Sequence, residues 1–220
     1  MESLLINQPG RFGDILICLP IAKWYSQKFE ISWFCPQQYH NLFRNISYCK
    51  PVSEIKQQYN KTIDLSFGLN TNTALHKWWM TKQNTFQSFI IAKYIIASVP
   101  LLYRWKLEWK RNIEKEELLF NKVISKYGKD YVVVQEKTHD FAMKIDVKNK
   151  VLFEPIEDYN IFDWYKVLIL AKEIHCIDSC LANFVEVLPE ALTTSKYYYP
   201  TSKVPNLWDK TILINNWVIK

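Results

Sequence analysis

Two separate stretches of the chain share one pattern, an apolar strand followed by a polar turn and an apolar helix, and this pattern restricts the fold most. The first stretch is "LLINQPGRFGDILICLP", Leu4 to Pro20, and the second is "IHCIDSCLANFVEVL", Ile174 to Leu188. Strands and helices that alternate at this spacing predict parallel sheets covered by helices. The expected fold class is therefore α/β.

In the first half of the chain the pattern predicts strands at Leu4–Asn7, Ile31–Cys35 and Thr62–Gly68, and helices at about Ile15–Lys28 and from Pro36 onward. The region from about Thr81 to Lys126 reads as helical and ends before Gly128, a plausible residue to follow a helix. We expect a domain boundary there, with domains of residues 1–120 and 121–220.

In the second half the same reasoning predicts strands at Tyr131–Gln135, Lys150–Pro155 and Ile174–Asp178, and helices at Phe162–Glu173 and Ser179–Leu188. The last third contains "KYYYP" and "TILINNWVIK", which fit either short strands or a closing helix.

Composition narrows the cellular context. The five cysteines among 220 residues are scattered and form no CxxC pair, which favours a reducing compartment. No signal peptide is recognisable, and the longest apolar stretch, Phe89 to Tyr103, is too short to span a bilayer and contains Lys93 and Pro100. We therefore expect a cytoplasmic protein with no integral membrane association. The net charge of +6 favours an anionic partner.

The first turn is rich in glycine, although the chain has only four glycines where about fifteen are usual. Gly10 and Gly13 flank Arg11 in this loop and permit backbone angles or close approach that a side chain would block. Asp14 follows at the start of the helix. It can act as an N-cap, or as a carboxylate that takes a proton from an acceptor hydroxyl.

The second turn carries Asp178 and Ser179. Ser179 can cap the helix that follows, or the turn can hold a diphosphate with its hydroxyl and backbone N–H groups. Glu186, two helical turns further on, can accept hydrogen bonds from ribose hydroxyls or can simply face solvent. Lys137 and Lys144 are loop cations that can stabilise a departing diphosphate or can be ordinary surface charge.

A basic cluster with interleaved tryptophans lies in the middle region and consists of Arg104, Lys106, Lys110 and Arg111. The favoured interpretation is a solvated helix face with its aromatic residues packed inward. The alternative is a surface that contacts phosphates, as in a nucleic-acid-binding protein.

The two strand–turn–helix motifs together resemble the heptosyltransferase-like glycosyltransferases, in the order in which that family carries them. The resemblance implies a GT-B architecture of two Rossmann-like domains that face each other across a cleft. It implies an N-terminal acceptor domain with Asp14 as catalytic base. It also implies a C-terminal domain in which Asp178 and Ser179 bind a nucleotide-sugar diphosphate.

The sequence departs from that family's pattern. Cys180 follows Asp-Ser where glycine is usual, Asn183 replaces a common histidine, and no glycine-rich loop follows Gln135. The absence of an Asp-x-Asp motif agrees with a metal-independent transfer. The family resemblance implies inversion of the anomeric carbon. We expect a UDP-sugar donor and no cofactor.

Two acceptors stay open at this point. The small size, basic charge and high Trp and Tyr content slightly favour hydroxymethylated pyrimidine in double-stranded DNA, modified by a virus-encoded enzyme. The family's usual acceptor is a surface glycan such as lipopolysaccharide core. Two further alternatives are an inactive module that binds a nucleotide or nucleic acid, and an α/β interaction protein in which both turns are ordinary caps.

Overall fold

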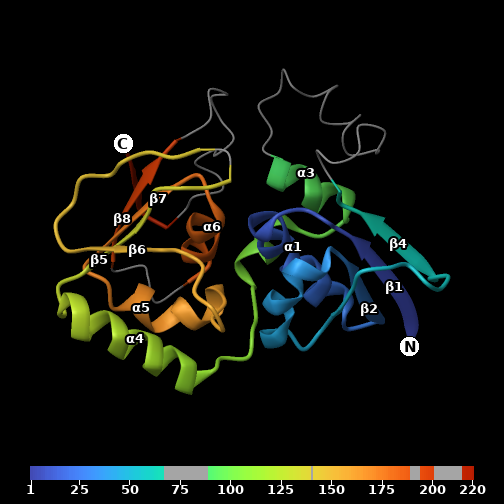
Figure 1. The fold of residues 1–220 in the computed structure, drawn as a ribbon. Coiled ribbons are helices and arrows are strands. Elements are labelled where there is room, and N and C mark those ends of the chain that lie inside the picture. The colour runs from blue at the N-terminus through green and yellow to red at the C-terminus, as the bar shows by residue number, and fades with distance from the viewer. Residues whose placement is uncertain (67–88, 140, 189–193, 201–214) are drawn as a thin grey trace. The chain divides into compact units, whose positions relative to one another are not determined.

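The computed structural model describes residues 1–66, 89–139, 141–188, 194–200 and 215–220 (Figure 1). These residues form two compact units, one up to Lys110 and the other from Arg111 onward. The division falls earlier than the boundary expected near residue 120, because the helix that begins at Ile113 packs against the second unit.

Unit 1 is built on four parallel strands in the order β3-β2-β1-β4. Residue Asn7 at the end of β1 pairs with Phe34 on one side and Asp64 on the other. The elements of this unit are β1 (Glu2–Asn7), α1 (Phe12–Tyr25), β2 (Phe29–Phe34), the 3-10 helix η1 (Gln37–Asn45), β3 (Lys50–Val52), β4 (Lys61–Asp64), α3 (Phe89–Ile96) and the 3-10 helix η3 (Leu101–Trp105).

Helix α1 is the centre of this unit. Its residues from Ile15 to Ala22 are all buried, so the helix is covered on every side, as its nearly continuous apolar sequence requires. The tyrosine hydroxyl of Tyr94 on α3 donates a hydrogen bond to the Ile17 carbonyl (2.9 Å), which fixes α3 against α1. Strand β1 contributes the fully buried Leu4 and Ile6 to the same core.

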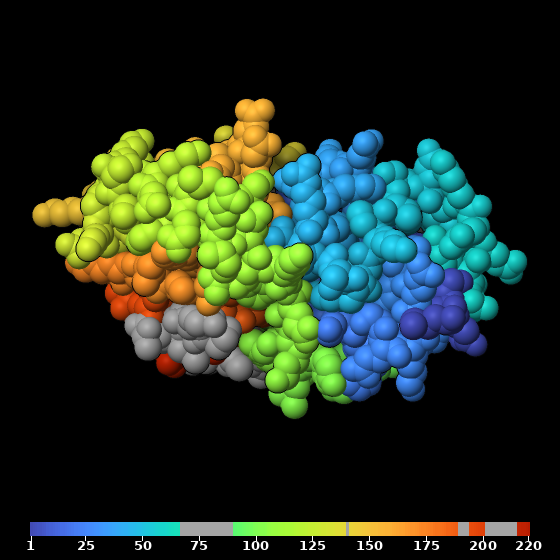
Figure 2. Space-filling view, turned by 90° about the horizontal axis from the view of Figure 1, so that it is seen from below, coloured from blue at the N-terminus to red at the C-terminus, as the bar shows by residue number. Residues whose placement is uncertain are grey.

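Unit 2 is built on five parallel strands in the order β6-β5-β7-β8-β9. Helix α4 packs beside α5 and is exposed along the surface of this unit, where Figure 2 shows it in yellow-green. The elements are α4 (Ile113–Tyr127), β5 (Val132–Gln135), β6 (Lys150–Leu152), the 3-10 helix η4 (Ile161–Trp164), α5 (Tyr165–Ile169), β7 (Glu173–Ile177), α6 (Cys180–Glu186), β8 (Ser195–Tyr199) and β9 (Trp217–Ile219).

The parallel α/β organisation predicted from the sequence is confirmed in both units. The two C-terminal motifs form strands rather than a closing helix; residues 211–214 lie outside the described part. Helix α4 ends at Tyr127 and is followed by Gly128, whose φ of +74° lies in the region that favours glycine.

Two helix predictions are wrong in extent. The expected helix over 81–126 is interrupted after Ile96, where Ser98 has a φ of +53° and Pro100 follows; residues 81–88 lie outside the described part. The expected helix over 162–173 ends at Ile169, because Glu173 already begins strand β7.

Candidate functional site

The loop between β1 and α1 is closely packed around Gly10. The Gly10 N–H donates to the Oε1 atom of Gln8 (3.2 Å), and Gln8 is buried. A Cβ atom at position 10 would lie 3.0 Å from Gln8 Oε1 and 3.1 Å from both Cβ and Oδ2 of Asp14. Since Gly10 does not have a positive φ, close approach rather than an unusual backbone angle explains this glycine.

Asp14 lies in the first turn of α1, as the sequence predicted, but it does not cap the helix. The N-cap is Arg11, an exposed residue whose side chain makes no capping hydrogen bond, and α1 begins at Phe12 rather than near Ile15. Gly13 lies inside the first turn. The interpretation of Asp14 as an N-cap is therefore wrong, and its carboxylate has another environment.

The Asp14 side chain is 30% exposed and lies at the carboxyl edge of the unit 1 sheet. One of its oxygens, Oδ1, is 3.5 Å from the ammonium of Lys93. Burial raises the pKa of the nearby Cys18 thiol to about 11, so that thiol stays neutral near pH 7. Asp14 is thus an accessible carboxylate at the edge where parallel α/β sheets bind ligands.

The carboxyl edge also holds polar residues that sequence reasoning missed. The side-chain amide of Asn7 donates to Oδ1 of Asp64 (3.1 Å), and the same oxygen accepts from the amide and the hydroxyl of Ser66 (3.0 and 2.5 Å). The Oδ1 atom of Asn7 is buried and accepts no hydrogen bond. The sequence carried a signal for this cluster. A polar residue ends each of two apolar strands, Asn7 in "LLIN" and Asp64 in "TIDLS".

The second turn has the capping geometry. Ser179 is the N-cap of α6, and its Oγ accepts a hydrogen bond from the Ala182 amide (3.3 Å). Its carbonyl accepts from the Asn183 side chain (3.1 Å). Asp178 precedes it and is half-buried. Burial raises the pKa of the Cys180 thiol, so Cys180 is a neutral group at this turn near pH 7.

Strand register brings the loop after β5 to the same edge as this turn. Gln135 at the end of β5 pairs with Cys176 on β7, so both strands end side by side. Lys137 lies two residues after the end of β5 and is exposed. Lys144 is also exposed and lies beyond a short antiparallel bridge from Lys137 to Ala142. The carboxyl edge of unit 2 therefore combines the Asp178–Ser179 turn with an exposed lysine.

Glu186 ends helix α6 in the interior of unit 2. It is fully buried, so the interpretation that it faces solvent is wrong. Its Oε2 accepts a hydrogen bond from Nε1 of Trp217 (2.7 Å), and its carbonyl accepts from the Asn215 side chain. These contacts tie α6 to the C-terminal strand, and this placement gives no support to a role in binding ribose.

The basic cluster does not form a helix face. Arg104 belongs to η3 and is 1% exposed, and Arg111 forms a bidentate pair with the Glu116 carboxylate (2.6 Å). Lys106 and Lys110 lie in an irregular segment between η3 and α4. Lys106, Lys110 and Arg111 are exposed, but Arg111 is paired with Glu116, so two cations of the cluster, Arg104 and Arg111, are buried or paired.

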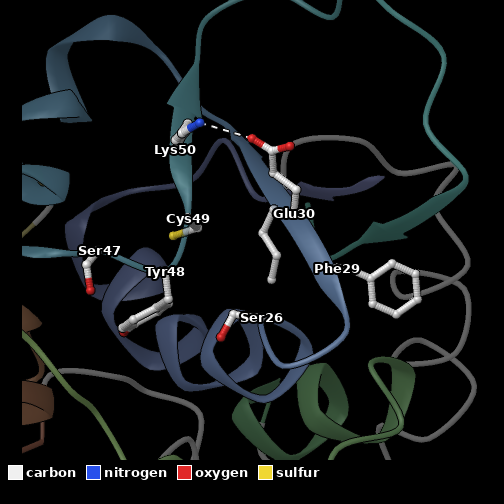
Figure 3. Close-up of a pocket in the computed structure, with 8 residues that line it drawn as sticks. Ser26, Phe29, Glu30, Ser47, Tyr48, Cys49 and Lys50 are labelled. Carbon is white, nitrogen blue, oxygen red and sulfur yellow. Dashed lines mark hydrogen bonds and ion pairs between the residues drawn. The ribbon is translucent and has the colours of Figure 1, made fainter. Parts of the chain in front are cut away.

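A pocket of about 240 Å³ opens elsewhere, at the amino edge of the unit 1 sheet (Figure 3). The ion pair between Lys50 and Glu30 (3.0 Å) closes one side of it. Ligands of parallel α/β sheets bind at the opposite, carboxyl edge, so we attach no catalytic role to this pocket. Its lining residues are Ser26, Phe29, Glu30, Ile31, Ser47, Tyr48, Cys49 and Lys50.

Comparison with solved structures gives the class of fold. The chain is similar to a glycosyl transferase of family 9 from Veillonella parvula, with a TM-score of 0.57 and 8% identity over 100% of this chain and 85% of that one. It is also similar to E. coli heptosyltransferase WaaC with ADP, with a TM-score of 0.50 and 12% identity over 90% of this chain and 86% of that one. The chain is similar as well to WaaC with ADP-2-deoxy-2-fluoro heptose, with a TM-score of 0.52 and 11% identity over 99% of this chain and 92% of that one.

No family model matches the sequence, and no curated protein matches it. The structural likeness establishes the fold, that of heptosyltransferase-like GT-B glycosyltransferases, as the two sequence motifs predicted. Function has to be argued from the site, because one fold can carry several activities. Within the described ranges, none of the helices is both long and apolar enough to cross a bilayer.

Proposed function

We propose that the protein is a glycosyltransferase that moves a sugar from a nucleotide-sugar donor to an acceptor hydroxyl. The observation that carries the proposal is the position of Asp14. It is a partly exposed carboxylate in the first turn of α1, at the carboxyl edge of a parallel sheet, in a chain with a glycosyltransferase fold.

The proposed step is a direct displacement. The Asp14 carboxylate takes the proton of the acceptor hydroxyl while the acceptor oxygen forms a bond to the anomeric carbon. The bond from that carbon to the diphosphate oxygen breaks, and the nucleoside diphosphate leaves with the electron pair. A single displacement of this kind inverts the anomeric carbon and uses no metal ion.

The proposed donor site is the Asp178–Ser179 turn with Lys137. The Ser179 hydroxyl already accepts from the Ala182 amide and keeps its own proton to donate to a phosphate oxygen. Lys137 is exposed on the adjacent loop and supplies a positive charge for the departing diphosphate. Lys144 is a second, more distant cation of the same loop.

A glycan is the acceptor we now favour over DNA. The solved structures with this fold include a heptosyltransferase. In the basic cluster expected to contact DNA phosphates, Arg104 is buried and Arg111 is paired with Glu116, so fewer cations are available for phosphates. ADP-sugars should be tested as donors beside the expected UDP-sugars, since WaaC binds ADP-2-deoxy-2-fluoro heptose.

The test is mass spectrometry of acceptors after incubation with the protein and a pool of ADP-, UDP- and GDP-sugars. The acceptors are lipopolysaccharide core oligosaccharides and DNA that contains hydroxymethylcytosine or hydroxymethyluracil. A gain of one sugar on a glycan supports the proposal as stated, and a gain on DNA corrects the acceptor. Donor binding without a sugar transferred or hydrolysed would instead indicate an inactive binding module.

A further inference from the structure

Lys93 is a charged residue inside an apolar helix. Helix α3 reads "FIIAKYII", and Lys93 on it is 0% exposed. A buried ammonium is unfavourable unless it is paired and hydrogen-bonded. The contacts of Lys93 therefore indicate what this side chain does for the fold or for the site.

Those contacts lie at the carboxyl edge of the unit 1 sheet. The Lys93 ammonium donates a hydrogen bond to the carbonyl of Leu65 (3.0 Å) and lies 3.5 Å from Oδ1 of Asp14. Leu65 follows β4 directly, and its amide donates to the Asn7 carbonyl at the end of β1 (2.8 Å). Lys93 thus connects α3, the end of β4 and the first turn of α1.

The two oxygens of the Asp14 carboxylate have different neighbours. Oδ1 is next to the buried ammonium, whereas Oδ2 points to the loop side, 3.1 Å from the place where a Cβ of Gly10 would lie. The ammonium therefore limits rotation of the carboxylate. Because Lys93 itself is not exposed, its route to an acceptor in the described part of the chain is through Asp14.

We infer that Lys93 is a positioning residue that orients the Asp14 carboxylate, with Oδ2 as the oxygen that takes the acceptor proton. This inference rests on the proposed function of Asp14 as base. In the step, the proton moves from the acceptor hydroxyl to Oδ2, and Lys93 takes no part in the proton transfer.

A kinetic double-mutant cycle tests the inference. Lys93→Met is expected to lower kcat about 10- to 100-fold, since a misplaced catalytic group costs rates of this order, and to change the donor KM less than about twofold. In the Asp14→Asn background it should cause no further loss. Lys93→Arg should recover part of the rate, and Lys28→Met, which removes an exposed lysine of the same unit, should leave it unchanged.

Two results would overturn the inference. One is an equal loss of kcat on Lys93→Met in the wild-type and Asp14→Asn backgrounds. The other is a rise in donor KM parallel to the loss of kcat, because a residue with a merely structural role affects both kcat and KM. Failure of both Lys93→Met and the double variant to fold would also overturn it and assign Lys93 to the core.

A second readout does not depend on activity. The shift of the urea midpoint caused by Lys93→Met should differ between the Asp14 and Asp14→Asn backgrounds, because Lys93 without its carboxylate is a buried, less compensated charge. Identical shifts would overturn the pairing. A wild-type protein that transfers no sugar would overturn the proposed function instead, so the two failures are distinguishable.

Discussion

Gly10 shows how a single residue can connect folding to the site. It leaves little room for a methyl group, because side-chain atoms of Gln8 and Asp14 both approach the position of its missing Cβ to about 3 Å. Two of the three neighbouring atoms belong to Asp14, the proposed base. Any side chain at position 10 must therefore move the carboxylate or the loop.

Gly10→Ala is expected to lower the free energy of unfolding by about 1–3 kcal/mol, the usual cost of forcing a methyl group into a packed site. It should also lower sugar transfer, because Asp14 is displaced. Urea unfolding and product formation measure the two effects.

Gly128→Ala is the matched control. Its φ is +74°, but no atom lies within 4 Å of the added Cβ, so only backbone strain of about 1 kcal/mol is expected and transfer should be unchanged. If Gly10→Ala is as harmless to transfer as Gly128→Ala, the close approach has no role in the site.

Some residue assignments could be predicted and others could not. Asp14 and Gly10 were identifiable because their spacing after an apolar strand is local information. Lys93 appeared only as an interruption of an apolar stretch, since its contacts to Leu65 and Asp14 are long-range in sequence. The burial of Glu186 could not be predicted, because its partner, Trp217, is 31 residues away.

At the scale of elements, the turn between β7 and α6 combines an observed role with a proposed one. Ser179 caps the helix in the structure, and in the proposed function the same hydroxyl donates to a diphosphate. Aspartate caps helices about as well as serine but carries a negative charge. Substitutions at this one position can therefore separate the two roles.

Ser179→Ala should lose about 0.5–2 kcal/mol of stability through the missing cap and should weaken donor binding as well. Ser179→Asp should keep the stability of the wild type but repel the diphosphate. Thermal unfolding with and without ADP- or UDP-sugars measures both quantities. Equal donor binding by Ser179→Asp and wild type would place the diphosphate somewhere other than this turn.

The elements themselves were predictable where the periodicity was strong and local. Strands β1, β5 and β7 lie within a few residues of their predicted positions. The middle region was misread because residues 106–112 have helical spacing but are held by tertiary contacts. The Lys110 amide donates to the Asn45 carbonyl (2.7 Å), and the Asn45 side chain donates back to the Lys110 carbonyl (2.8 Å).

At the scale of the whole molecule, unit 2 depends on an irregular segment that covers one face of its sheet. Ile145 packs with Val132, Val134 and Ile177 in one apolar cluster. Glu136 secures this segment, since its Oε1 accepts from the Ile145 amide (2.6 Å) and from Lys150 (2.7 Å).

The stability of the protein should therefore depend on the ionisation of Glu136. Partial burial acts to raise the pKa of this carboxyl, but the hydrogen bonds from Lys150 and the Ile145 amide outweigh it and lower the pKa below its usual 4.5. A folded-state pKa below the unfolded one adds stability above pH 4.5, and this stability is lost as the pH falls through the folded value.

Wild type should accordingly be more stable than Glu136→Gln at pH 7. The gap should begin to close near pH 4.5 and vanish below the folded-state pKa. Urea midpoints of the two proteins measured from pH 7 to pH 3 check this. A gap that stays constant over that range would mean that the charge of Glu136 contributes nothing.

The most direct measurement is the release of nucleoside diphosphate from ADP- and UDP-sugars in the presence of a glycan acceptor, compared between wild type and Asp14→Asn. We predict steady release by wild type and a loss of about 10²- to 10⁴-fold in the variant, the range for removal of a general base. The variant should still bind the donor. Equal release by the two proteins would contradict Asp14 as the base, and no release by either would contradict the proposed glycosyltransferase activity.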